Sequence, residues 1–301
     1  MKKLYGHFIL IAVTILLAGC DKPAPTELFD DSDQIQVEVI SSDPDDEFYS
    51  TGFDSTGLAE NPVNYTNLVT VSGIKTTRNS GTENMSFAQA VFFDRNAPVF
   101  GPNGRLLGYR TLNPGLVRFN NIPAQLHPFR INFRGHGGEH ADTSLGSRYV
   151  LSNDRGHPNN FLFPFDSFIK FEFVPILSGG VISFGIPTPK EITASAKVSG
   201  KFSDRNLRIE LEWNGANHND FELIIGTKIK EEERVIPLFR VRTEDDGHLI
   251  IPTNLINQIP QERFNHLLFS LVRKIERDYM EGETEFHIIS TSIHSIVIEN
   301  P

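Results

Sequence analysis

From about residue 65 to the end of the chain, hydrophobic and polar residues alternate, and turn residues recur every eight to fifteen positions. A period of two is typical of strands that turn one face to a core and the other to water. The clearest run is residues 207–213, in which four apolar residues alternate with three charged ones. The pattern therefore predicts a mostly β protein built from sheets that pack face to face.

In the last third of the chain, the alternation predicts strands at residues 191–198, 207–213, 221–227, 235–241 and 249–251, with two more near the end. Asp246 and Gly247 predict a turn, and residues 252–260 fit one short helical turn between two prolines. Residues 267–279 fit a helix face as well as a strand. We favour the strand because a final strand at residues 286–298 needs a neighbour.

Two prolines, Pro187 and Pro189, mark the expected boundary between two folded domains, since neither residue suits a central strand. Before them, residues 62–187 predict a β-rich domain of unknown type. Phenylalanine-rich alternation at 129–134, 168–174 and 181–186 suggests that this domain is also a sandwich. After them, residues 188–301 predict seven short strands, which is typical of an immunoglobulin-like sandwich, with Trp213 as a core anchor.

Residues 188–301 resemble immunoglobulin-like modules of uncharacterised bacterial lipoproteins and secreted proteins. The resemblance rests on a strand that ends in Trp213, on the strand at 221–227 after a polar loop, and on Asp245-Asp246-Gly247 before an apolar segment that ends at Pro252. It covers about a third of the chain. The resemblance implies a fold, but it indicates no catalytic or binding residues.

The N-terminus predicts a signal peptide. Lys2 and Lys3 precede an uncharged run at residues 8–18, and small residues lead to Cys20. As a helix the run would span roughly 16 Å, well short of the roughly 30 Å of a bilayer core. The alternatives are a short anchor or an ordinary signal peptide in which Cys20 is incidental.

Residues 17–20, Leu-Ala-Gly-Cys, resemble the lipobox of bacterial lipoproteins. The resemblance implies that residues 1–19 are removed and that the Cys20 thiol carries diacylglycerol. Cys20 is the one cysteine of the chain, so it has no disulfide partner within it. Two or three acyl chains, at roughly 0.8 kcal/mol per buried CH₂, suffice for stable anchoring. The mature protein is therefore expected outside the cytoplasm on a cell membrane, attached through lipid.

The choice between inner and outer membrane stays open. Asp21 resembles a signal for retention at the inner membrane in some bacteria, whereas Asp30, Asp31 and Asp33 are compatible with the acidic signals that other lineages use for export to the surface.

Acidic residues are concentrated just after Cys20. Residues 21–60 contain twelve acidic residues and one lysine, in a chain whose formal charge is −10. Residues 20–61 therefore predict a disordered acidic tether, kept extended by self-repulsion. The alternative, a calcium loop at residues 43–47, lacks the glycine and the ligand spacing of an EF-hand. The negative balance also argues against a nucleic-acid partner.

The motif His136-Gly137-Gly138-Glu139-His140 matches the H-x-x-E-H pattern of inverted zinc peptidases. That chemistry needs a helix, because only a helix brings histidines four residues apart onto one face. Two glycines and a preceding predicted strand make a polar loop the simpler interpretation. A metal-dependent hydrolase that uses His136, Glu139 and His140 stays open as an alternative. Further ligands for such a loop would be His127, Asp142 and His157.

Six phenylalanines flank Pro164 and could line a groove for a glycan, although core packing explains them more simply. They are Phe161, Phe163, Phe165, Phe168, Phe171 and Phe173. The basic pairs Arg240/Arg242 and Arg273/Lys274 are interpreted as solvated strand faces. The chain lacks nucleophile, phosphate-loop and dinucleotide motifs. The sequence thus favours a lipid-anchored envelope protein with a binding or structural role and no cofactor, whose partner is the membrane together with an envelope protein or a glycan.

Overall fold

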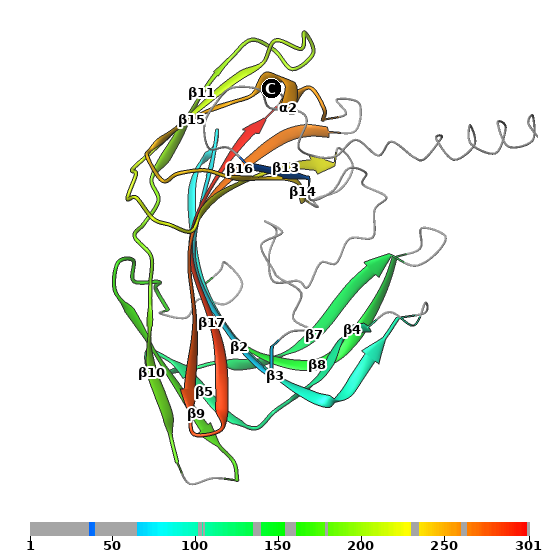
Figure 1. The fold of residues 1–301 in the computed structure, drawn as a ribbon, viewed down its shortest axis with the longest axis vertical. Coiled ribbons are helices and arrows are strands. Elements are labelled where there is room, and N and C mark those ends of the chain that lie inside the picture. The colour runs from blue at the N-terminus through cyan, green and yellow to red at the C-terminus, as the bar shows by residue number, and fades with distance from the viewer. Residues whose placement is uncertain are drawn as a thin grey trace, which may run out of the picture. The chain divides into compact units, whose positions relative to one another are not determined.

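The computed structural model describes residues 36–39, 65–101, 104, 106–134, 140–153, 161–177, 180–229, 235–259 and 264–299. In these residues strands dominate, and the one α-helix is the short α2 (Thr253–Ile256). The strands form three sheets, antiparallel except where β17 (Thr284–Glu299) meets β2 (Asn67–Arg78). The predicted mostly β, sandwich-like fold is confirmed (Figure 1).

The largest sheet has the order β1-β14-β13-β16-β17-β2-β3-β8-β7, and β4 pairs with β3 outside this path. Its other strands are β1 (Gln36–Val39), β3 (Gly81–Phe100), β4 (Leu106–Leu112), β7 (Gln125–Arg134), β8 (His140–Asn153), β13 (Phe221–Ile229), β14 (Val235–Arg242) and β16 (Phe264–Glu281).

Two smaller sheets pack on this large sheet. One has the order β10-β9-β5-β6 and consists of β5 (Gly115–Phe119), β6 (Ile122–Pro123), β9 (Phe168–Pro175) and β10 (Ile182–Pro187). The other has the order β11-β12-β15 and consists of β11 (Ala194–Ser199), β12 (Arg208–Trp213) and β15 (His248–Ile251). The first sheet shares a hydrophobic core with β2, β3 and β8, and the second shares one with β13, β14 and β16. Two sandwiches are therefore built on one continuous sheet.

The strands predicted for the last third of the chain are confirmed as β11 to β15, and the predicted helical turn is α2. The ambiguous segment at residues 267–279 lies in β16, which pairs with β17 from His266 to Glu281. Its residues Leu267, Phe269 and Leu271 are buried in the second core, as the period of two requires. The helical alternative would have left β17 without this neighbour.

The β16–β17 hairpin contributes to both cores. Leu267 and Phe269 lie in the second core at one end of the hairpin, whereas Phe286 lies in the first core near its other end. Phe286 is fully buried, and its ring centroid lies 5.5 Å from that of Phe184 and 5.6 Å from that of Phe171. Strand β10 ends at Pro187, close to the predicted boundary, but the end of the chain returns to the first core. The division into domains at 187/188 stays a prediction.

A parallel pair joins the two sandwiches within the large sheet. Residues 287–296 of β17 lie in register with residues 68–77 of β2, side by side in Figure 1. Parallel neighbours need a long connection, and here almost the whole described chain lies between the two strands.

Strand β1 lies inside the range predicted as an acidic tether, and it pairs with β14 from Gln36 to Val39. Cys20, the signal peptide and the acidic residues at 43–47 lie outside the described residues. The remainder of the predicted tether therefore stays a prediction.

Candidate functional site

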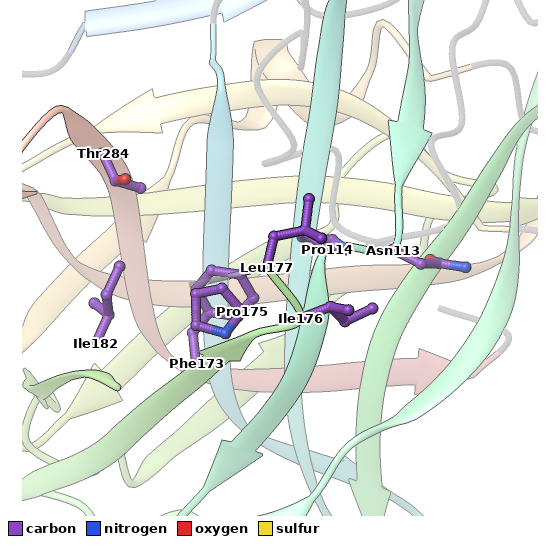
Figure 2. A pocket seen from close by; sticks show the side chains of 8 residues that line it. All are labelled: Asn113, Pro114, Phe173, Pro175, Ile176, Leu177, Ile182 and Thr284. Carbon is purple, nitrogen blue, oxygen red and sulfur yellow. The ribbon is translucent and has the colours of Figure 1, made fainter. Parts of the chain in front are cut away.

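An apolar pocket of about 510 Å³ opens where the end of β9 meets the turn between β16 and β17 (Figure 2). Its walls come from the residues before β5, the end of β9, the start of β10 and the start of β17. The lining residues are Asn113, Pro114, Phe173, Pro175, Ile176, Leu177, Ile182 and Thr284.

Close contact between β5 and β9 fixes one wall of this pocket. Gly115 lies opposite Pro175, and a Cβ atom on Gly115 would lie 2.0 Å from the carbonyl oxygen of Val174, so only glycine fits there. The hydroxyl of Tyr149 donates a hydrogen bond to the Gly115 carbonyl at 2.6 Å, and burial raises the pKa of this phenol. The Ile176 amide donates to the Pro114 carbonyl at 2.8 Å.

The rim of the pocket exposes aliphatic side chains to solvent. Leu177 is 99% exposed, Ile176 is 74% exposed, and Val181, next to Ile182, is 59% exposed. Exposed apolar residues that gather in one place are typical of an interaction surface. The polar side chains of the lining are the Asn113 amide and the Thr284 hydroxyl, which carry no charge. This lining favours burial of an apolar group.

The phenylalanines considered for a glycan groove lie mostly in the first core. Phe161, Phe163, Phe171 and Phe173 are buried there, and Phe165 packs against them. Phe168 is exposed, and Phe173 also lines the apolar pocket. The structure therefore brings one of the six to a candidate site. Sequence reasoning missed Ile176 and Leu177. The available signal was an apolar pair directly before the sequence Ser-Gly-Gly.

The histidine motif falls largely outside the described residues, which resume at His140. The flanking strands β7 and β8 pair as far as Arg134 and His140, so a five-residue connection links them. The predicted strand at 129–134 is confirmed as part of β7. In the part of the chain that the structure describes, no three His, Cys, Asp or Glu residues lie close enough to hold a metal ion. The metal-dependent hydrolase stays an untested alternative.

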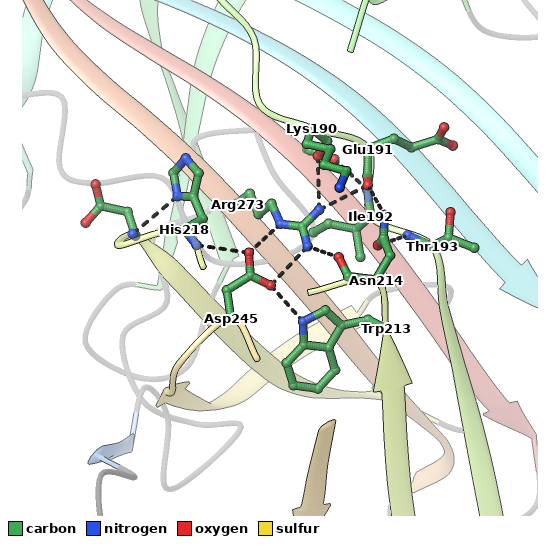
Figure 3. A network of polar contacts seen from close by, with 11 residues as sticks. Lys190, Glu191, Ile192, Thr193, Trp213, Asn214, His218, Asp245 and Arg273 are labelled. Carbon is green, nitrogen blue, oxygen red and sulfur yellow. Dashed lines mark hydrogen bonds and ion pairs between the residues drawn. The ribbon is translucent and has the colours of Figure 1, made fainter. Parts of the chain in front are cut away.

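A buried ion pair joins Arg273 on β16 to Asp245, in the loop between β14 and β15 at one end of the second sandwich (Figure 3). Arg273 on β16 donates to both carboxylate oxygens of Asp245, from Nε to Oδ2 at 2.7 Å and from Nη2 to Oδ1 at 2.9 Å. Trp213 Nε1 donates to Oδ1 at 2.8 Å, and the His218 amide donates to Oδ2 at 3.3 Å. Burial alone would raise the pKa of Asp245, but the hydrogen bonds from Arg273 and Trp213 and the charge of Arg273 hold it below its ordinary value.

The remaining donors of Arg273 bind backbone carbonyls. Nη1 donates to Glu191 at 3.0 Å and to Lys190 at 3.3 Å, and Nη2 donates to Asn214. This side chain therefore ties the segment that leads into the second sandwich to β16 and to the loop after Trp213. The ion pair holds the sandwich together and lies away from solvent, with Arg273 fully buried.

The interpretation of Arg273 as part of a solvated strand face is wrong. Arg273 follows Leu271 and precedes Ile275 at a spacing of two, so the alternation itself places it on the core face of β16. Its charge is tolerated there because Asp245 and three carbonyls satisfy it. Arg242, by contrast, is exposed as expected.

A second buried polar residue, His294 on β17, binds the start of β11. Its Nδ1 accepts a hydrogen bond from the Ala194 amide at 2.9 Å, and Nε2 lies 2.9 Å from the Thr77 hydroxyl. An accepting Nδ1 requires the neutral ring, with the proton on Nε2. Burial, and then the charge of Lys75, lower the pKa of His294 to about 4.

We expect stability to fall in mild acid because of His294. The pKa of His294 is about 4 in the folded chain and about 6.5 in the unfolded chain. Between about pH 4 and pH 6.5 the imidazole is therefore protonated in the unfolded chain and neutral in the folded chain. The free energy of unfolding should therefore drop by about 2 kcal/mol from pH 8 to pH 5 on this account. Urea unfolding of His294→Gln should lack this part of the pH dependence. His248→Gln, which removes an exposed histidine, should keep this pH dependence. If the free energy of unfolding of His294→Gln falls with pH as steeply as that of the starting protein, His294 is not its cause.

No family model matches the sequence, and no curated protein or solved structure shows a significant similarity to it. The inference about function therefore rests on the residues and their geometry. Among the described residues, no helix has the length and apolar character needed to cross a membrane.

Proposed function

We propose that this protein is a lipoprotein of a bacterial cell envelope, attached to a membrane through lipid on Cys20, and that it acts by binding an apolar group of a partner. The observation that carries the binding role is the apolar pocket with exposed Ile176 and Leu177 at its rim. Its lining, apolar except for the uncharged Asn113 and Thr284, favours burial of a hydrophobic group.

The anchoring part of the proposal rests on the lipobox at residues 17–20 and the acidic stretch after it. Lipid on Cys20 would place the folded part outside the cytoplasm. The proposal leaves the choice between inner and outer membrane open, because Asp21 and the acidic cluster after it indicate different destinations.

We also propose that residues 188–301 form an immunoglobulin-like module, supported by the order of the strands. Strands β11, β12 and β15 form one sheet. Strands β14, β13, β16 and β17 lie next to one another, in that order, in the layer opposite. Immunoglobulin-like sandwiches place their strands in a similar way. Such a module is a scaffold, so the binding role is assigned to the pocket in the first sandwich.

Binding of an apolar probe tests the proposed role. The protein without lipid, produced without residues 1–19 and with Cys20 replaced by Ser, should increase the fluorescence of an anilinonaphthalene dye, since the pocket can bury its rings. Leu177→Ser should reduce this binding at least several-fold, because a hydroxyl replaces an isobutyl group at the rim. Val198→Ser removes an exposed aliphatic residue from β11 and serves as the matched control. Equal dye binding by all three proteins would refute the role of the pocket.

A further inference from the structure

Exposed aliphatic side chains gather around the apolar pocket. Strands β9 and β10 reach the end of the first sandwich at which β16 turns into β17 (Figure 1). Ile176 and Leu177 follow β9, Val181 precedes β10, and Leu116 lies on β5 opposite Val174. We call the four exposed residues Leu116, Ile176, Leu177 and Val181 the apolar tip.

The apolar tip reaches the outer face of the small sheet as well as the pocket. Phe173 lies in the first core, so the alternation of β9 turns its neighbour Val174 to the outer face. Leu116, opposite Val174, lies on the same face and is exposed. Apolar residues therefore meet solvent on more than one side of this end of the sheet.

Charged residues begin on the outer face only further from the tip. Arg118 lies opposite Glu172, and Lys170 Nζ lies 2.8 Å from Glu172 Oε1. Residues 111–117 and 173–189, which supply the tip, include no charged residue. Charged side chains avoid the hydrocarbon of a bilayer and stay at the level of its headgroups. An uncharged end with a charged band behind it therefore suits partial entry into a lipid layer.

We propose that the apolar tip inserts into the surface of a phospholipid bilayer. This inference rests on the proposed binding function and names phospholipid as the partner. Ile176 and Leu177 belong both to the tip and to the lining of the pocket, so insertion would bring acyl chains to the pocket. The Ile176 amide already donates to the Pro114 carbonyl, which removes one cost of leaving water.

The size and chemistry of the tip favour a lipid surface over a second copy of the chain. Four exposed aliphatic side chains offer about 250–500 Å² in all. Each partner in a standard protein interface buries about 800 Å², and Trp, Tyr and Arg supply most of the binding energy there. The tip has none of these three residue types. A bilayer needs no matched hydrogen bonds and accepts a small aliphatic surface.

Vesicle flotation tests the inference. The protein without residues 1–19 and with Cys20→Ser is mixed with phosphatidylcholine vesicles at millimolar lipid. It should float with them at low and at high salt, and phosphatidylglycerol should not strengthen binding, because the tip has no lysine or arginine. Ile176→Ser with Leu177→Ser should weaken partitioning at least tenfold. Val198→Ser with Ile250→Ser, which removes exposed aliphatic residues from the second sandwich, should leave it unchanged.

A fluorescent label reports on the tip itself. The Cys20→Ser protein contains no other cysteine, so Leu177→Cys in this protein accepts a single nitrobenzoxadiazole label. Phosphatidylcholine vesicles should raise its emission and shift it to shorter wavelength, and spin-labelled lipid should quench it. A label attached through Val198→Cys, on β11, should respond to neither.

Three results would overturn the inference. Binding only to vesicles that contain phosphatidylglycerol, lost in high salt, would mean that charge holds the protein to lipid. Vesicle binding without a response of the label at residue 177 would place the contact elsewhere. A dimer seen by analytical ultracentrifugation, and lost in the Ile176→Ser and Leu177→Ser double variant, would mean that a second copy covers the tip.

The dye experiment separates this inference from the proposed function. If the anilinonaphthalene dye binds in a manner that needs Leu177 but vesicles do not bind, the lipid inference is overturned while the pocket keeps its role. If neither the dye nor the vesicles bind, the proposed function falls together with the inference.

Discussion

Replacement of Cys20 by Ala should release the protein from the membrane fraction almost completely. A thioether-linked diacylglycerol gives two acyl chains and N-acylation adds a third, and their loss removes roughly 0.8 kcal/mol for every buried CH₂. The wild-type protein, which keeps Cys20, should sediment with membranes, resist extraction by high salt and dissolve in detergent. Because an uncleaved signal peptide could itself retain the variant, residues 1–19 are replaced in parallel by a cleavable secretion signal.

Asp21→Asn is the matched control for this experiment, because it changes the neighbouring residue and leaves the Cys20 thiol in place. It should stay in the membrane fraction, and any shift between inner and outer membranes would show whether Asp21 is a sorting signal. Mass spectrometry of the native protein gives the decisive result. A free thiol at residue 20, or an N-terminus that retains residues 1–19, would contradict the lipoprotein assignment.

Replacement of Asp245 by Ala should lower the free energy of unfolding by about 3–5 kcal/mol. The variant leaves the guanidinium of Arg273 buried without its counterion, and Trp213 Nε1 without its acceptor. Arg273 is fully buried and cannot turn to solvent without moving β16. Urea unfolding, followed by circular dichroism, measures the loss, and the fluorescence of Trp213, the one tryptophan of the chain, reports on this sandwich directly.

An exposed ion pair provides the comparison. Lys197 Nζ lies 2.5 Å from Glu212 Oε1 on the surface, where solvent screens the charges, so Glu212→Ala should leave the free energy of unfolding almost unchanged. A loss below about 1 kcal/mol for Asp245→Ala would mean that Arg273 finds another partner or water, and the network would then not hold the sandwich together.

Sequence periodicity predicted the strands of the second sandwich because each strand there has one face in the core. Leu207, Leu211 and Trp213 alternate with charged residues, and the core contains all three. The same periodicity places Arg273 on the core face of β16, whereas its charge led to the prediction that it faces solvent. Its partner, Asp245, lies in the loop before β15, and pairing across 28 residues cannot be inferred from alternation alone.

The apolar pocket could not be predicted for a related reason. Its walls come from four separate segments, and alternation indicates which face of a strand is buried without indicating what covers it. Phe173 was among the residues considered for a binding groove, yet Ile176 and Leu177 were not, because they lie beyond the end of the alternating run. The parallel contact of β17 with β2 is equally hidden, since the two strands lie about 220 residues apart in the chain.

The hairpin of β16 and β17 has a consequence for biogenesis. Phe286 completes the first core, and β2 gains its parallel neighbour only from residues 287–296. The first core is therefore complete only after nearly all of the polypeptide has been synthesised. Contacts of such long sequence separation slow folding. If the chain is exported as proposed, this order of assembly would favour export, because a polypeptide whose core is not yet complete can still pass through a translocation channel.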